Sequence, residues 1–85
     1  MKELLLNFYC PSMSKSYDFW VPKTMLVASV IDQICDAICE YENKENIFTK
    51  RDKLVLCSYL NNTALPKAFS LEQSGIRSGD KLILI

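Results

Sequence analysis

The chain of 85 residues contains no histidine, only two glycines and one tryptophan, and its formal net charge is zero. Without histidine, a histidine-based catalytic triad or general base is excluded within this chain, and no Gly-rich phosphate-binding loop is present. Ten basic and ten acidic residues cancel, so no overall field draws the protein to nucleic acid. We therefore expect a protein that is not an enzyme, that needs no cofactor and that has no nucleic-acid partner.

Long hydrophobic runs are also missing. No apolar stretch approaches the roughly 20 residues of a membrane span, and the run at residues 4–6 is broken by Asn7, too soon for the apolar region of a signal peptide. Apolar residues make up 49% of the chain and are spread throughout, which argues against disorder. These features predict a single domain over residues 1–85, a cytoplasmic location and no direct membrane insertion.

Four cysteines are present, at Cys10, Cys35, Cys39 and Cys57. With no export signal, reduced thiols are favoured over disulfides. Cys35 and Cys39 are four residues apart on a predicted helix and could share a metal ion, but the chain offers no histidine and no second close pair. We expect no metal site and interpret the cysteines as small buried hydrophobes.

The hydrophobic period identifies the first three elements. Alternation over residues 4–10 and 17–21 predicts an antiparallel hairpin, with Pro11 in the intervening turn. From Thr24, a candidate helix N-cap, the period changes to about 3.6 and predicts a helix ending near Glu42. Its buried stripe comprises Val27, Val30, Ile31, Ile34, Cys35, Ile38 and Tyr41.

The second half of the chain reads as a loop over residues 43–52, a strand over 53–60 and a short return strand over 63–65. The turn at Asn61 and Asn62 is able to adopt positive φ at both positions. A helical turn and a final strand complete the order.

Residues 71–85 combine a buried Leu71, a Gly75-Ile76 pair, a Ser-Gly-Asp turn and the terminal strand. The last strand is best placed beside the first, in parallel, and is reached by a right-handed crossover through the helix. This order predicts an α+β fold, the ubiquitin-like β-grasp, with a mixed sheet of four to five strands and one main helix packed on one face.

The pattern Leu-x-x-x-Gly-Ile-x-x-Gly-Asp-x-Leu in residues 71–82 resembles the closing segment of many ubiquitin-like domains. It is particularly similar to that of the YukD/EsaB-like family, small cytosolic ubiquitin-like proteins of type VII (WXG100) secretion systems in Gram-positive bacteria. Residues 17–22 and 30–32 also resemble the second strand and helix entry of that family. The resemblance implies a non-enzymatic accessory subunit that contacts the cytosolic parts of a secretion machine, and it supplies no catalytic residues.

Two surfaces are candidate partner sites. In a β-grasp, one face of the sheet lies away from the helix, and apolar residues alternate onto it, which predicts an apolar docking patch on that face. The predicted patch residues are Leu5, Tyr9, Trp20, Ile83 and Ile85. On the helix, three acidic residues at spacings of four are either a solvated face or a patch that awaits a basic partner: Asp32, Asp36 and Glu40.

The leading functional hypothesis is an adaptor that docks through the outer sheet face to a partner protein or to a second copy of itself. A ubiquitin-like modifier or sulfur carrier is the alternative, and the apolar ending at residues 82–85, in place of a flexible Gly-Gly tail, disfavours it. A small subunit of a larger enzyme assembly is a third possibility.

Overall fold

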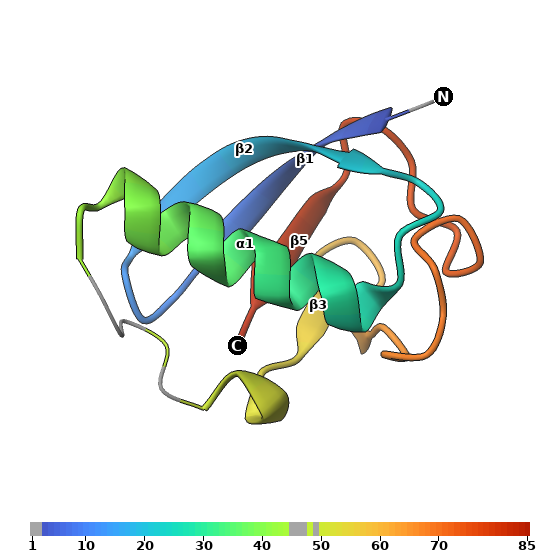
Figure 1. The fold of residues 1–85 in the computed structure, drawn as a ribbon. Helices are drawn as coiled ribbons and strands as arrows, with labels where there is room; N and C mark the ends of the chain where they lie inside the picture. The colour runs from blue at the N-terminus through green and yellow to red at the C-terminus, as the bar shows by residue number, and fades with distance from the viewer. Residues whose placement is uncertain (1–2, 45–47, 49) are drawn as a thin grey trace.

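The computed structural model describes residues 3–44, 48 and 50–85 (Figure 1). Two long strands form a hairpin, a helix and a short 3-10 helix follow, and three short strands complete the chain. The elements are β1 (Glu3–Cys10), β2 (Lys15–Pro22), α1 (Val27–Tyr41), η1 (Arg51–Lys53), β3 (Leu56–Ser58), β4 (Thr63–Ala64) and β5 (Lys81–Leu84).

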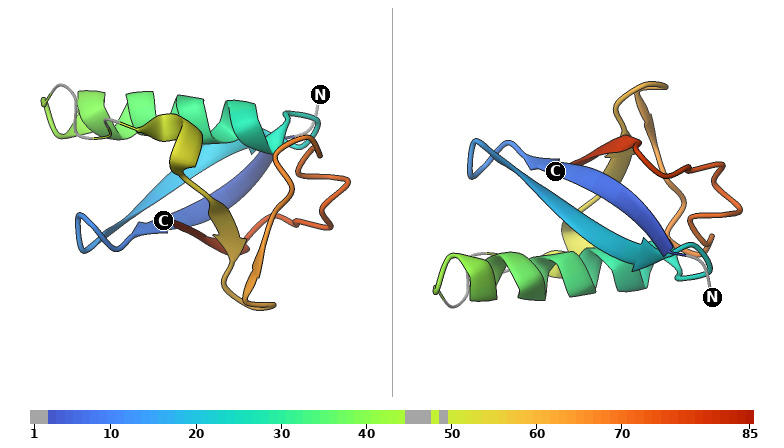
Figure 2. Two further views of the ribbon diagram at one scale, coloured as in Figure 1. Left: turned by 90° about the horizontal axis from the view of Figure 1, so that it is seen from below. Right: turned by 90° about the horizontal axis from the view of Figure 1, so that it is seen from above.

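The five strands form one mixed sheet in the order β2-β1-β5-β3-β4. β1 and β5 are parallel, whereas β1 with β2, β3 with β5 and β3 with β4 are antiparallel. α1 crosses one face of the sheet, as the two turned views in Figure 2 show. The predicted placement of the last strand beside the first, at the centre of a mixed sheet, is confirmed.

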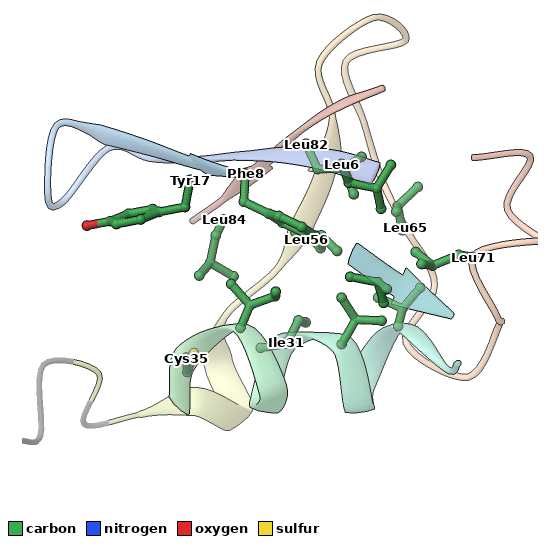
Figure 3. Packing of buried hydrophobic residues seen from close by; sticks show 14 of the residues in the cluster. Leu6, Phe8, Tyr17, Ile31, Cys35, Leu56, Leu65, Leu71, Leu82 and Leu84 are labelled. Carbon is green, nitrogen blue, oxygen red and sulfur yellow. The ribbon is translucent and has the colours of Figure 1, made fainter. Parts of the chain in front are cut away.

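Alternation along the strands decides which side chains face α1. Leu6 and Phe8 in β1, and Leu82 in β5, are fully buried on the side of the sheet that faces α1, in one core with Ile31 and Cys35 (Figure 3). The six buried residues of α1 are the predicted stripe without its last member: Val27, Val30, Ile31, Ile34, Cys35 and Ile38. One core between sheet and helix therefore holds the fold together.

The helix begins later than the sequence predicts. Its N-cap is Leu26, without a side-chain cap, and Thr24 lies in the preceding turn. The first free amides are satisfied from the second half of the chain instead: Val27 N–H donates to the Phe69 carbonyl at 2.8 Å and Ala28 N–H to the Lys67 carbonyl at 3.2 Å. The assignment of Thr24 as N-cap was wrong because backbone carbonyls distant in sequence replace a side-chain cap.

Three further predictions need correction. Tyr41 was placed on the buried stripe, but 75% of it is exposed, because it lies at the last residue of α1 beyond the core. The strand predicted over residues 53–60 is shorter, since η1 ends only at Lys53 and residues 59–62 form the turn to β4. Only Asn62 in the β3–β4 turn has positive φ, at 54°. The predicted loop over residues 43–52 falls partly outside the described residues.

The segment before β5 anchors the sheet to the helix entry. Leu71 is fully buried and Ile76 nearly so. Gly79 adopts φ of 93°, where a side chain would strain the backbone, and this geometry lets its N–H donate to the Leu5 carbonyl at 2.7 Å. The turn thereby aligns β5 with β1.

Candidate functional site

The sheet face opposite α1 carries a row of side chains from four neighbouring strands. Tyr9 in β1 pairs with Ile83 in β5, Ile83 with Cys57 in β3, and Cys57 with Ala64 in β4. Residues directly opposite each other on neighbouring strands have Cβ atoms only about 5 Å apart. None of the four is charged, and none is fully buried. The row is therefore a continuous, uncharged and partly exposed strip across the sheet.

Two exposed residues extend this row. Ile85, 61% exposed, follows Ile83 on the same face, and Tyr59, 60% exposed, follows Cys57. Both remain in the ladder: Ile85 and Val55 exchange two hydrogen bonds of 2.9 Å, and Tyr59 N–H donates to the Lys81 carbonyl at 3.0 Å. We name Tyr9, Cys57, Tyr59, Ile83 and Ile85 the outer patch.

The ammonium group of Lys81 borders the outer patch. The Lys81 ammonium lies 4.8 Å from the ring centroid of Tyr59 and 5.6 Å from that of Tyr9. Both distances are within the range of attractive cation–π contacts. The two phenol rings therefore hold a positive charge beside an apolar surface, which suits a partner that presents a carboxylate next to an apolar side chain.

The structure divides the five residues predicted as one docking site into two groups. Tyr9, Ile83 and Ile85 belong to the outer patch. Leu5 and Trp20 face each other at the far end of the β1–β2 hairpin and are 38% and 61% exposed.

A polar row separates these groups. Asn7 Nδ2 donates to Asp18 Oδ1 at 2.9 Å, and Lys81 lies opposite Asn7. Leu5 and Trp20 are thus a second, smaller apolar surface on the same side of the sheet.

Sequence reasoning missed four residues of this site: Cys57, Tyr59, Ala64 and Lys81. A signal for two of them was available, since Val55, Cys57 and Tyr59 alternate within the predicted third strand in the same way as the residues of β5. Leu56, the residue before Cys57, is buried, so alternation places Cys57 and Tyr59 on the opposite face of the strand.

The predicted acidic patch on α1 is partly neutralised within the chain. The Nη1 atom of Arg51, in η1, lies 2.6 Å from Asp36 Oδ1 and 3.9 Å from Asp32 Oδ1, and it donates to the Asp32 carbonyl at 3.5 Å. Glu40 is exposed and forms no salt bridge among the described residues. A basic partner would therefore compete with Arg51 for two of the three carboxylates.

A polar cluster joins β2 to the end of α1. The Tyr17 hydroxyl donates to Glu42 Oε2 at 2.7 Å, and Lys15 Nζ donates to both carboxylate oxygens of Glu42 at 3.0 and 3.1 Å. The hydrogen bond from Tyr17 and those from Lys15 hold the pKa of Glu42 below its ordinary value. Burial, with the bond to Glu42 as second cause, raises the pKa of Tyr17 to about 12.

This cluster predicts a loss of stability at alkaline pH. Because the folded-state pKa of Tyr17 lies above its ordinary value of 10, the contribution is complete below pH 10 and is lost as pH rises through about 12. We expect the free energy of unfolding, measured by urea titration, to fall more steeply over this interval in the native chain than in Tyr17→Phe. If the free energy of unfolding fell equally steeply with pH in the two proteins, the raised pKa of Tyr17 would be contradicted.

The cysteines divide between core and surface. Cys10 and Cys35 are buried, Cys39 and Cys57 are partly exposed, and all four are free thiols. The reading as buried core residues therefore fails for Cys57, which alternation places on the outer face, and for Cys39 at the edge of α1. Among the residues that the structure describes, no three Cys, Asp or Glu side chains group as metal ligands, and no helix is long and apolar enough to cross a membrane.

No protein-family model matches the chain, and neither does any of the curated proteins. Solved structures are similar over nearly its whole length. The EccD5 ubiquitin-like domain from Mycobacterium xenopi superposes with a TM-score of 0.78 at 16% identity, covering 100% of this chain and 94% of that one. The chain has the ubiquitin-like β-grasp fold.

Two more ubiquitin-like domains support this assignment. One belongs to an Arabidopsis thaliana protein, with a TM-score of 0.74, 19% identity and coverage of 100% of this chain and 78% of that one. The other is the UBL domain of Plasmodium falciparum Dsk2, with a TM-score of 0.73, 14% identity and coverage of 98% and 96%. At these identities the similarity establishes the ubiquitin-like fold, and function must be argued from the surfaces.

Proposed function

We propose that this chain is a non-enzymatic accessory or adaptor protein of a bacterial type VII secretion system, and that it binds a protein partner through the outer patch. The observation that carries the proposal is the uncharged row of Tyr9, Ile83, Cys57 and Ala64 on a sheet face that no described helix covers. A sheet with one face in water normally alternates apolar and polar residues. A contiguous apolar surface in its place is typical of a partner site.

The pathway rests on the similarity of residues 71–82 to the YukD/EsaB-like family. The expected partner is then a cytosolic part of the secretion machine. Lys81, held between Tyr9 and Tyr59, adds a requirement for a carboxylate on that partner. The absence of histidine supports a role in binding rather than catalysis.

The proposal is tested by affinity isolation of the tagged chain from its source cells after cross-linking. We expect cytosolic domains of secretion-system subunits, encoded near an FtsK-type ATPase and small WXG-containing proteins. Intact-mass analysis of the recovered chain separates this role from that of a modifier, for which a covalent adduct at the C-terminus is expected. Recovery of the adduct alone, with no secretion subunit, would refute the proposal.

A second copy of the chain is the other partner to distinguish. Self-association through the outer patch would make sedimentation depend on protein concentration. We expect the purified chain to remain a monomer at micromolar concentration, because a second copy would present its own Lys81 ammonium, and no carboxylate, to the Lys81 ammonium beside the outer patch.

A further inference from the structure

The border of the sheet formed by β2 is a second surface with a defined chemistry. β2 has eight residues and pairs with β1 alone, whereas β4, at the opposite border, has two. Figure 1 shows β2 at the edge of the sheet, with no described strand on its outer side. Long exposed edges are templates for pairing with another chain, and proteins usually shorten or cover them.

The hydrogen bonds of β1 show which groups of β2 point outward. Asn7 N–H donates to the Asp80 carbonyl and the Leu5 carbonyl accepts from Gly79 N–H, so odd-numbered residues of β1 bond toward β5. Even-numbered residues of β1 must therefore bond to their opposite residues in β2: Leu6 with Phe19, and Phe8 with Tyr17.

The backbone N–H and C=O groups of the intervening residues, Ser16, Asp18 and Trp20, are consequently directed to the open border. Outside the strand ladders, no described backbone group bonds to their amides. Three consecutive donor–acceptor pairs are thus presented at the spacing of a β-ladder.

A hollow of about 260 Å³ opens beside this border. It lies between β2 and the end of α1 and is lined by Ser16, Tyr17, Asp18, Phe19 and Tyr41. Tyr17 stacks on Phe19 with ring centroids 6.2 Å apart and meets the edge of Tyr41 at 5.8 Å. An aromatic-walled hollow of this size accommodates an aliphatic side chain.

The negative charge of Asp18 indicates which residue of an added strand should lie opposite it. Its carboxylate accepts from Asn7 but forms no salt bridge among the described residues. A residue paired with Asp18 across a new ladder points to the same side of the sheet, and its two neighbours point toward the hollow. The sequence that fits is apolar, basic, apolar.

A second copy of the chain fits this border poorly. Its own β2 would offer Tyr17 and Phe19 on the hollow side, and these are already packed in their own core. The symmetric register centred on residue 18 would also place Asp18 opposite Asp18, and like charges directly opposite are destabilising. The strand that binds here must therefore have side chains that are not already packed in a core of their own.

We propose that β2 binds an extended segment of a partner protein as a sixth strand, and that this segment has the order aliphatic, Lys or Arg, aliphatic, with the basic residue opposite Asp18. The backbone groups of Ser16, Asp18 and Trp20 supply the binding, and the hollow at Phe19 and Tyr41 supplies the selectivity. This site is separate from the outer patch.

The test uses the isotopically labelled full chain and the peptide Gly-Ser-Thr-Val-Lys-Val-Thr-Ser-Gly, titrated to about 1 mM. We expect saturable NMR shifts centred on β2 and hydrogen exchange slowed about tenfold at the amides of Ser16, Asp18 and Trp20. The amides of Tyr17 and Phe19, already bonded to β1, should change less. The same peptide with Glu in place of Lys should bind about tenfold more weakly.

Variants separate this site from others. Asp18→Pro removes one outward N–H and should abolish binding, and Asp18→Arg, which keeps the backbone, should reverse the preference to the Glu peptide. Ile83→Lys should leave binding unchanged. Absence of saturable shifts, shifts centred on Ile83, or protection of the three amides by self-association without peptide would each overturn the proposal.

Discussion

Replacing Leu82 by alanine should lower the free energy of unfolding by about 2–5 kcal/mol, the range for truncating a buried leucine. Leu82 is fully buried in the strand between β1 and β3, opposite Phe8 on one side and Ser58 on the other. Removal of its side chain leaves a cavity that the paired strands cannot easily close. Urea unfolding followed by circular dichroism measures the change.

Ile83→Ala, one position along β5, is the matched control. Its side chain lies on the opposite face and is partly exposed, so the loss should be no more than about 1.5 kcal/mol. A loss at Ile83 as large as the loss at Leu82 would show that the faces of β5 are wrongly assigned. An unfolded Leu82→Ala chain would agree with the account, because many small domains have only about 5 kcal/mol of stability.

Replacing Ile83 by lysine should reduce recovery of the partner at least about tenfold while leaving the fold intact. Ile83 is at the centre of the outer patch, between Tyr9 and Cys57, so an added ammonium there must be desolvated when the partner binds. Without a partner, the flexible lysine stem lets the charge reach water. Recovery is measured by quantitative mass spectrometry after affinity isolation, beside a thermal unfolding curve of each purified variant.

Two further variants serve as controls for Ile83→Lys. Ser29→Lys adds the same charge on the exposed face of α1 and should leave recovery unchanged. Trp20→Asp alters the second apolar surface across the polar row, so it should reduce recovery less than Ile83→Lys. Equal recovery of the partner with the native chain and with Ile83→Lys would show that the partner does not bind through the outer patch.

The sequence was sufficient for the fold because the apolar periods are strong. Alternation in residues 4–10 and the 3.6 period from Val27 to Ile38 specify which residues meet, and the two glycines mark the turns before β5. The order of the elements, with a right-handed crossover through the helix, then places the last strand beside the first. The apolar periods and the glycine turns are local features of the sequence, and the structure contains the elements that they predict.

The features that could not be predicted from the sequence depend on contacts between residues that are distant in the chain. The helix starts at Val27 because carbonyls of Lys67 and Phe69 cap it. Asp32 and Asp36 share the single positive charge of Arg51, nineteen and fifteen residues later, respectively. No local pattern reveals such partners. The division of the outer sheet face into two apolar surfaces likewise depends on the register of the strands. This register places Asn7, Asp18 and Lys81 in one row.

The most direct test of the outer patch uses Cys57, a thiol within the patch itself. Brief alkylation of the purified chain and of the native complex, followed by mass spectrometry, compares Cys57 with Cys39, which is also partly exposed but lies on α1. If a partner covers the outer patch, Cys57 should react at least about tenfold more slowly in the complex while Cys39 is unchanged. Equal reactivity of Cys57 in the complex and in the purified chain would contradict the account.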